Sequence, residues 1–121
     1  NLATTVHREL GQGLPEHVYK KALIIELDEA QIPYEVDKQI DITYKKQHLT
    51  SFNVDLVIKN KLLVGFACDD ELKKKLKITM LSILRILGKQ TGLLLDYSHD
   101  TLYYKRIVYK AKKEHDIEAA Y

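Results

Sequence analysis

LLVGFACDDELKKKLKITMLSILRIL, residues 62–87, is the stretch that decides the fold class of this chain. It opens with a continuous apolar run from Leu62 to Cys68, which is typical of a strand in the middle of a sheet. Acidic residues follow at 69–71, and apolar side chains then recur at helical spacing. Acids stabilise the start of a helix through its dipole, so we expect a helix to begin here and to end at Gly88. A buried strand followed by an amphipathic helix indicates an α/β protein.

The segments on both sides extend this unit into a mixed sheet. Apolar and polar residues alternate before residue 62, and Lys59-Asn60 predicts a tight hairpin turn. Two further apolar stretches follow Gly88. The other expected elements are helices over about 2–10 and 15–31 and strands over 34–44, 52–58, 92–97 and 101–109. The order ααβββαββ predicts a mixed central β-sheet flanked by helices.

Length and composition exclude several classes of protein. A chain of 121 residues with 45% apolar residues suits one domain over 1–110, followed by a polar tail at 111–121 whose composition is compatible with a helix. No apolar run approaches the roughly 20 residues that span a bilayer, and no signal peptide opens the chain. We therefore expect a soluble intracellular protein without membrane partners. The single cysteine, Cys68, excludes an internal disulfide and is expected to be a small buried apolar residue.

Basic residues gather in two places although the formal net charge is only +2. The first cluster is Lys73, Lys74, Lys75 and Lys77, and the second is Lys105, Arg106, Lys110, Lys112 and Lys113. Lysine and arginine clusters can neutralise phosphates, which makes DNA or RNA a candidate partner. The alternative is a solvated lysine-rich surface, which is common on proteins that never bind nucleic acid.

The stretch VHRELGQGLPEHVY, residues 6–19, carries a family signature. Gly13, Glu16 and Tyr19 occupy the named positions of the GxxExxY motif, and the chain resembles the GxxExxY family of the PD-(D/E)XK nuclease superfamily. The motif alone would be a weak pattern. The likeness continues through most of the chain, roughly from Val6 to Val108, and includes the strand around Asp55.

The resemblance implies a metal-dependent nuclease site. Such a site has an acid on the first long helix, an Asp on one strand and a Glu-x-Lys on the next; the carboxylates hold Mg²⁺ and the lysine helps to activate water. Glu16 and Asp55 match, but Gly65 and Ala67 stand in place of the Glu and the Lys. The family's helical Gln is replaced by Thr79. Neither glycine nor alanine can bind a cation or polarise water.

Individual residues have a structural as well as a functional interpretation. Glu16 is either a relic metal ligand or an acid that stabilises the first turn of a helix. Asp55 is either a relic ligand or a solvated residue on the polar side of its strand. Gly65 marks either an eroded site or a structural feature, which would be a β-bulge or close packing against a helix. Tyr19 is expected in the core, and His7 is expected to have a structural role.

We therefore hypothesise a catalytically inactive pseudo-nuclease that keeps the fold for binding or assembly and needs no cofactor. Its setting would be a protein or ribonucleoprotein complex, with homo-oligomerisation as a further alternative. The competing hypothesis is an Mg²⁺-dependent nuclease with a rearranged site made of Glu16, Asp55 and Asp69. The triplet Glu71-Leu72-Lys73 also spells Glu-x-Lys, but it lies at an expected helix start, 16 positions after Asp55.

Overall fold

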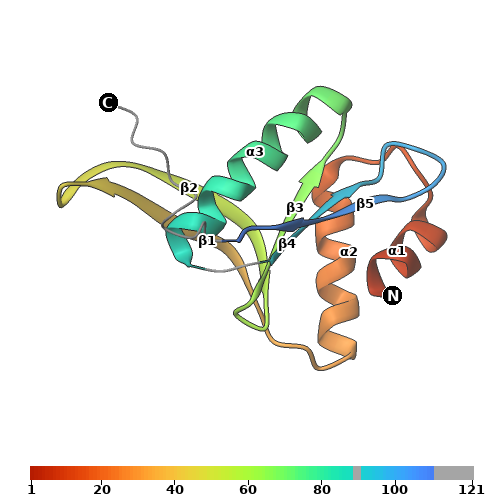
Figure 1. Ribbon diagram of the computed structural model, residues 1–121. Helices are drawn as coiled ribbons and strands as arrows, with labels where there is room; N and C mark the ends of the chain where they lie inside the picture. The colour runs from red at the N-terminus through yellow and green to blue at the C-terminus, as the bar shows by residue number, and fades with distance from the viewer. Residues whose placement is uncertain (89–90, 111–121) are drawn as a thin grey trace.

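The computed structural model describes residues 1–88 and 91–110 and contains a five-stranded mixed sheet between helices (Figure 1). The helices are α1 (Leu2–Leu10), α2 (Glu16–Glu29) and α3 (Asp70–Leu87), and the strands are β1 (Tyr34–Tyr44), β2 (Gln47–Ile58), β3 (Leu62–Ala67), β4 (Thr91–Asp96) and β5 (Tyr103–Val108). The predicted element order is confirmed. The tail at 111–121 lies outside the described residues. Among the described residues, no helix is long and apolar enough to span a membrane.

The strands follow one another across the sheet in the order β1-β2-β3-β4-β5, so β3 is the central strand, as predicted. Neighbouring strands are antiparallel except for β3 and β4, which are parallel. Parallel neighbours need a crossover connection, and α3 supplies it. The carboxyl ends of β3 and β4 therefore meet beside the start of α3.

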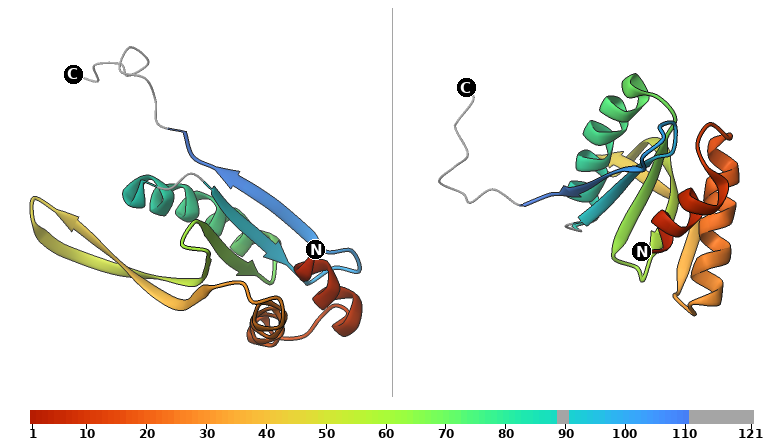
Figure 2. Two further views of the ribbon diagram at one scale, coloured as in Figure 1. Left: turned by 90° about the horizontal axis from the view of Figure 1, so that it is seen from below. Right: turned by 90° about the vertical axis from the view of Figure 1, so that its right-hand side faces the viewer.

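Helices cover both faces of the sheet (Figure 2). On one face α1 and α2 enclose a cluster that includes Leu23, Leu56 and Leu95. On the other face α3 covers a second cluster that includes Leu63 and Leu84. Side chains of successive strand residues point to opposite faces, which is why one sheet supplies both clusters.

The ends of the helices follow their capping residues. The Asp69 carboxylate accepts a hydrogen bond from the Leu72 amide at 2.7 Å and caps α3. Gly88 ends this helix in the left-handed conformation, with φ of 68°, as predicted. Pro15 was expected in the first turn of α2, but it lies at the capping position and the helix begins at Glu16.

Strand β2 differs from its prediction in two ways. It begins at residue 47 rather than 52, because β1 and β2 form a ribbon that projects from the sheet (Figures 1 and 2). Residues 47–53 are all exposed, so no alternation of apolar and polar residues predicted the part of the strand before residue 52. Strict alternation is also wrong: Val54 and Val57 both join the cluster under α3, while Leu56 joins the opposite one. Asp37 on β1 has a positive φ of 52° and is not matched with a residue of β2 in the pairing of the two strands.

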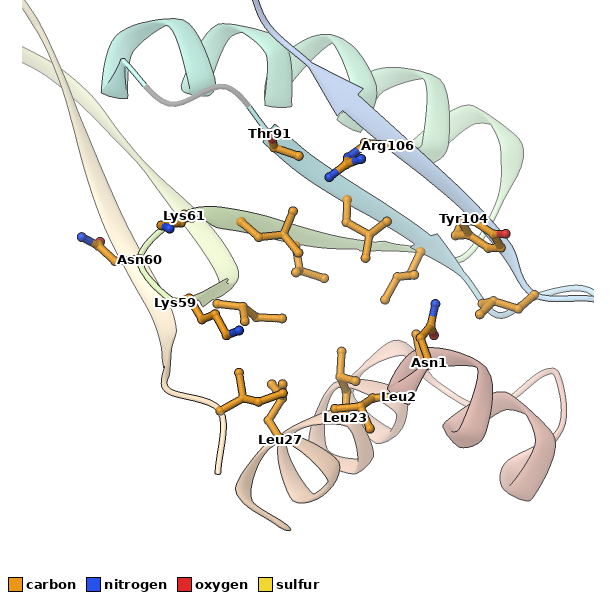
Figure 3. A pocket seen from close by; sticks show the side chains of 18 residues that line it. Asn1, Leu2, Leu23, Leu27, Lys59, Asn60, Lys61, Thr91, Tyr104 and Arg106 are labelled. Atoms are coloured by element: carbon orange, nitrogen blue, oxygen red, sulfur yellow. The ribbon is translucent and has the colours of Figure 1, made fainter. Parts of the chain in front are cut away.

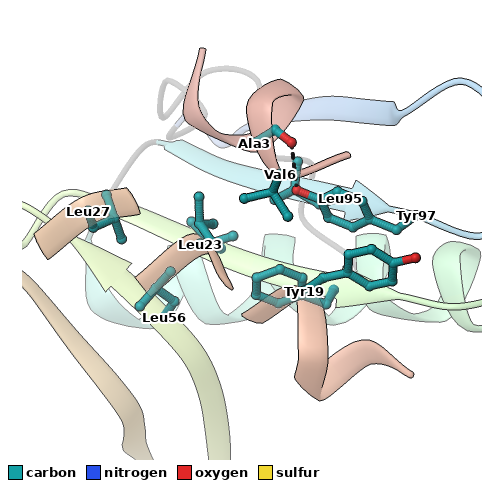
Figure 4. Packing of buried hydrophobic residues seen from close by; sticks show 10 residues of the cluster. Ala3, Val6, Tyr19, Leu23, Leu27, Leu56, Leu95 and Tyr97 are labelled. Atoms are coloured by element: carbon teal, nitrogen blue, oxygen red, sulfur yellow. Dashed lines mark hydrogen bonds between the residues drawn. The ribbon is translucent and has the colours of Figure 1, made fainter. Parts of the chain in front are cut away.

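Two stacked tyrosines tie the N-terminal helices to the sheet (Figure 4). The rings of Tyr19 and Tyr97 lie 4.2 Å apart and almost parallel, and the Tyr97 hydroxyl donates to the Ala3 carbonyl at 2.9 Å. The Tyr19 hydroxyl accepts from the Leu14 amide at 3.0 Å and donates to the Gly11 carbonyl at 2.7 Å. Tyr19 is buried as predicted, and it also fixes the loop between α1 and α2.

We predict that Tyr19→Phe lowers the free energy of unfolding by about 1–2 kcal/mol, because two backbone groups of the loop lose their partner. Chemical denaturation would measure it. Tyr44→Phe is the matched control, since Tyr44 is 64% exposed and its loss of a hydroxyl should change nothing measurable. Equal stability of the two variants would contradict the structural role of the Tyr19 hydroxyl.

Candidate functional site

The start of α2 forms one wall of the candidate site. Glu16 is the first residue of this helix, and Lys20 follows one turn later. Residues four apart lie on the same face of a helix, so both side chains point to the same side. Glu16 and Lys20 line a pocket of about 480 Å³ together with residues of the sheet.

The opposite wall comes from β2 and β3. The pairing of these strands ends at Leu56 and Val64, and Asp55 lies immediately beyond the last pair. Asp55 and Cys68 line the same pocket as Glu16. The structure thus brings together the two acids that match the family signature.

Lys20 is the counter-ion of the site. Its ammonium contacts the carboxylates of Asp37 and of Asp55, the latter at 3.4 Å, and its side chain is only 16% exposed. Burial works to lower the pKa of Lys20, but the hydrogen bond with Asp37 and the charge of Asp55 outweigh it and raise the pKa. Hydrogen bonds from Lys20 and Asn53 lower the pKa of Asp37. The sequence analysis missed Lys20, although its spacing from Glu16 was a visible signal.

Gly65 faces α3 and is closely covered. A Cβ atom built on it would lie 3.0 Å from Cδ2 of Leu76 and 3.1 Å from Cε of Met80. Gly65 therefore packs closely against α3, which was one of its structural interpretations. Ala67 is buried and lines a smaller pocket of about 150 Å³ beside Glu16. Thr79 is half-buried on α3 and lines neither pocket.

Cys68 corrects one expectation, because it is exposed rather than buried. β3 ends at Ala67, so Cys68 emerges from the sheet beside the start of α2. Its interaction with the Glu16 carboxylate, aided by desolvation and by the charge of Asp69, raises the thiol pKa to about 11. The group is therefore a neutral thiol at physiological pH.

Asp69 does not join Glu16 and Asp55 in the structure. Its carboxylate caps α3, and Asp69 does not line the pocket that the other two share. Within residues 1–88 and 91–110, one set of three acidic, histidine or cysteine residues has its ligand atoms within 4.8 Å of one another. That set is Asp70, Asp96 and His99.

Asp96 is the centre of this second cluster and is fully buried. It accepts hydrogen bonds from the Ser98 amide at 2.9 Å and the Ser98 hydroxyl at 2.5 Å. The Lys73 ammonium lies 3.3 Å from Asp96 and 3.1 Å from Asp70. His99 completes the group, with Nε2 3.5 Å from the Asp96 carboxylate.

Lys73 already supplies a cation to these carboxylates and also lies 3.9 Å from the centre of the Tyr103 ring. Burial works to raise the pKa of Asp96, but the Ser98 hydrogen bonds and the Lys73 charge outweigh it and lower the pKa. Asp96 was not among the predicted site residues, and an acid at the end of the apolar run 92–95 was the available signal. Lys73, predicted as part of a basic cluster that could bind phosphates, instead pairs with Asp70 and Asp96.

The other predicted basic residues point in several directions. Lys74, Lys75 and Lys77 are exposed on α3. Lys105 and Arg106 are neighbours on β5 and therefore lie on opposite faces of the sheet. Lys110 is exposed, and residues 112 and 113 lie outside the described residues.

Comparison with known proteins identifies the family. The family described as the PD-(D/E)XK nuclease superfamily matches residues 1–107. The chain belongs to this superfamily. No curated protein matches it in sequence. Two solved structures of an alkaline exonuclease from Laribacter hongkongensis, one of them in complex with dAMP, are similar to it with 13% identity and a TM-score of 0.48; each alignment covers 90% of this chain and 68% of the exonuclease.

The lowered pKa of Asp96 should make the stability of this member of the PD-(D/E)XK superfamily depend on pH. A carboxyl with a lowered pKa contributes stability above its ordinary pKa of about 4, and that stability is lost as the pH falls through the folded-state value. Asp96→Asn should lower the free energy of unfolding at pH 7 by roughly 3 kcal/mol, because Lys73 loses a buried partner. The variant should also lose less stability than the parent between about pH 4 and pH 2.

Denaturation at a series of pH values would test this. Asp100→Asn is the matched control, because Asp100 is exposed on the same loop. If Asp96→Asn loses as much stability as the parent when the pH falls from about 4 to 2, the cluster does not control stability in acid.

Proposed function

We propose that this chain is a non-catalytic PD-(D/E)XK module, similar to the GxxExxY family, that keeps the fold for binding or assembly. The single observation that carries the proposal is the packing of α3 over Gly65. By the resemblance to the GxxExxY family an acidic ligand would stand at this position, but Gly65 faces Leu76 and Met80 of α3 and does not line the pocket that Glu16 and Asp55 share. A neighbouring Ala67 leaves no lysine to activate water.

The charge around Asp55 supports the same proposal. A metal-dependent nuclease uses its carboxylates to hold Mg²⁺, which prefers several oxygen ligands. Here Lys20 provides a positive charge to Asp55 from within the protein. The protein therefore needs no metal ion to offset this carboxylate. We propose that its setting is a protein or ribonucleoprotein complex.

One observation favours the alternative of an Mg²⁺-dependent nuclease with a rearranged site. Glu16 and Asp55 line a common pocket, so two carboxylates of the kind that Mg²⁺ prefers border the same space. Asp69, the third ligand of that hypothesis, instead caps α3. A cleavage assay distinguishes the two proposals.

We predict that the purified protein leaves single-stranded and double-stranded DNA and RNA uncut in the presence of Mg²⁺ or Mn²⁺. Gel assays of the protein and of Asp55→Asn should give the same background, because the second ligand and the lysine are both missing. Metal-dependent cleavage that disappears in Asp55→Asn would overturn the non-catalytic proposal and support the alternative.

Nucleic acid is a candidate partner because the lysines of α3 are exposed together. Replacement of Lys74, Lys75 and Lys77 by glutamine should weaken binding to duplex DNA and reduce the salt slope, by about 0.9 for each phosphate that the variant no longer neutralises. Fluorescence anisotropy at several salt concentrations would measure both quantities. Lys73 is left intact because it holds the Asp96 cluster.

A matched control removes the same charge elsewhere, through glutamine at Lys21, Lys45 and Lys46, which are all exposed. This variant should keep the parental salt slope. An equal loss in both triple variants would indicate non-specific attraction, and no binding by the parent would favour a protein partner.

A further inference from the structure

A third pocket lies on the α1/α2 side of the sheet (Figure 3). Its volume is about 740 Å³, within the range of roughly 300–1,000 Å³ that is usual for small-molecule sites. It shares no lining residue with the pockets around Glu16. A ligand here would therefore be independent of the proposed function.

The interior of this pocket is apolar. Leu23 and Leu27 of α2 form one wall (Figure 3). Leu62 of β3 and Leu93 of β4 line the pocket from the sheet and form its floor. The two floor residues, and Leu102 after β4, remain partly exposed although most of their neighbours in the cluster are buried. The helices thus leave part of this apolar face open to solvent, where a hydrophobic ligand would gain free energy by covering it.

The charged residues around this interior all have the same sign. Lys59 and Lys61 lie at the hairpin turn between β2 and β3, and Arg106 extends from β5 (Figure 3). No aspartate or glutamate of the described residues lines the pocket. A ligand with an apolar body and a negative head would match both features, because the head would reach the cations while the body stays inside.

We propose that this pocket binds a free amphiphilic anion, of the kind represented by a long-chain carboxylate. The apolar surface is recessed between the helices and the sheet, which suits a slender chain rather than the flat surface of a bilayer. An inserted extended peptide would bury backbone amides among leucines that offer no hydrogen-bond partner. An alkyl chain has no such groups to satisfy.

Calorimetric titration with dodecanoate, below its micellar concentration, tests the proposal on the whole chain. Dodecyltrimethylammonium is the matched probe, since it has the same chain and the opposite charge. We expect saturable one-to-one binding of dodecanoate, at least tenfold tighter than that of the cationic probe. Equal binding of the two probes, or no saturable binding of dodecanoate, would overturn the proposal; the second result would favour a protein partner on this face.

Variants then locate the site. Lys61→Gln combined with Arg106→Gln should weaken dodecanoate binding about tenfold and should not weaken binding of the cationic probe, whereas Lys21→Gln, outside the pocket, should change neither. Leu102→Glu should abolish dodecanoate binding. Chemical-shift mapping of the parent with dodecanoate gives an independent readout if a variant fails to fold. Shifts centred away from Leu62 and Leu93 would reject the assignment.

Discussion

The close approach of α3 to the sheet at two glycines is the constraint on which the fold depends. Met80 lies over Gly65 on β3 and over Gly92 on β4, and a Cβ atom on Gly92 would overlap the Met80 sulfur. The parallel pair β3 and β4 needs a crossover helix, and the glycines let this helix pack directly on both strands. The same packing fills the space next to Gly65, the position at which the resemblance to the GxxExxY family implies an acid.

Lysines act as internal counter-ions in both polar clusters of the protein. Lys20 pairs with Asp37 and Asp55, and Lys73 pairs with Asp70 and Asp96. A carboxylate removed from water is costly unless it is paired and hydrogen-bonded. Asp96 is the clearest case, because it is fully buried and has hydrogen bonds from Ser98 as well as the ion pair. These lysines are therefore less available to phosphates than lysines on the exposed side of α3.

Two pockets on the α1/α2 side of the sheet present different chemistry. The pocket at the start of α2 has carboxylates and a lysine, while the pocket across β3, β4 and β5 is apolar with a basic rim. The two pockets share no lining residue, so a substitution can change one of them without touching the lining of the other.

The sequence by itself determined the element order, the central place of β3 and the end of α3 at Gly88. These features depend on local periodicity and on a glycine that can adopt positive φ, both of which are visible along the chain. The match of Glu16 and Asp55, with Gly65 and Ala67 beside them, was likewise visible as a pattern of residues. Only the tertiary structure decided which side chains meet. The Lys20 and Asp55 pair joins residues 35 positions apart, and the Lys73 and Asp96 pair joins residues 23 apart. No local period encodes such contacts. The break of alternation in β2 and the exposure of Cys68 depend on where neighbouring strands stop pairing, which is a property of the assembled sheet. The physical reason is that periodicity assigns a residue to a face, whereas the packing of α2 and α3 determines which charge lies opposite it.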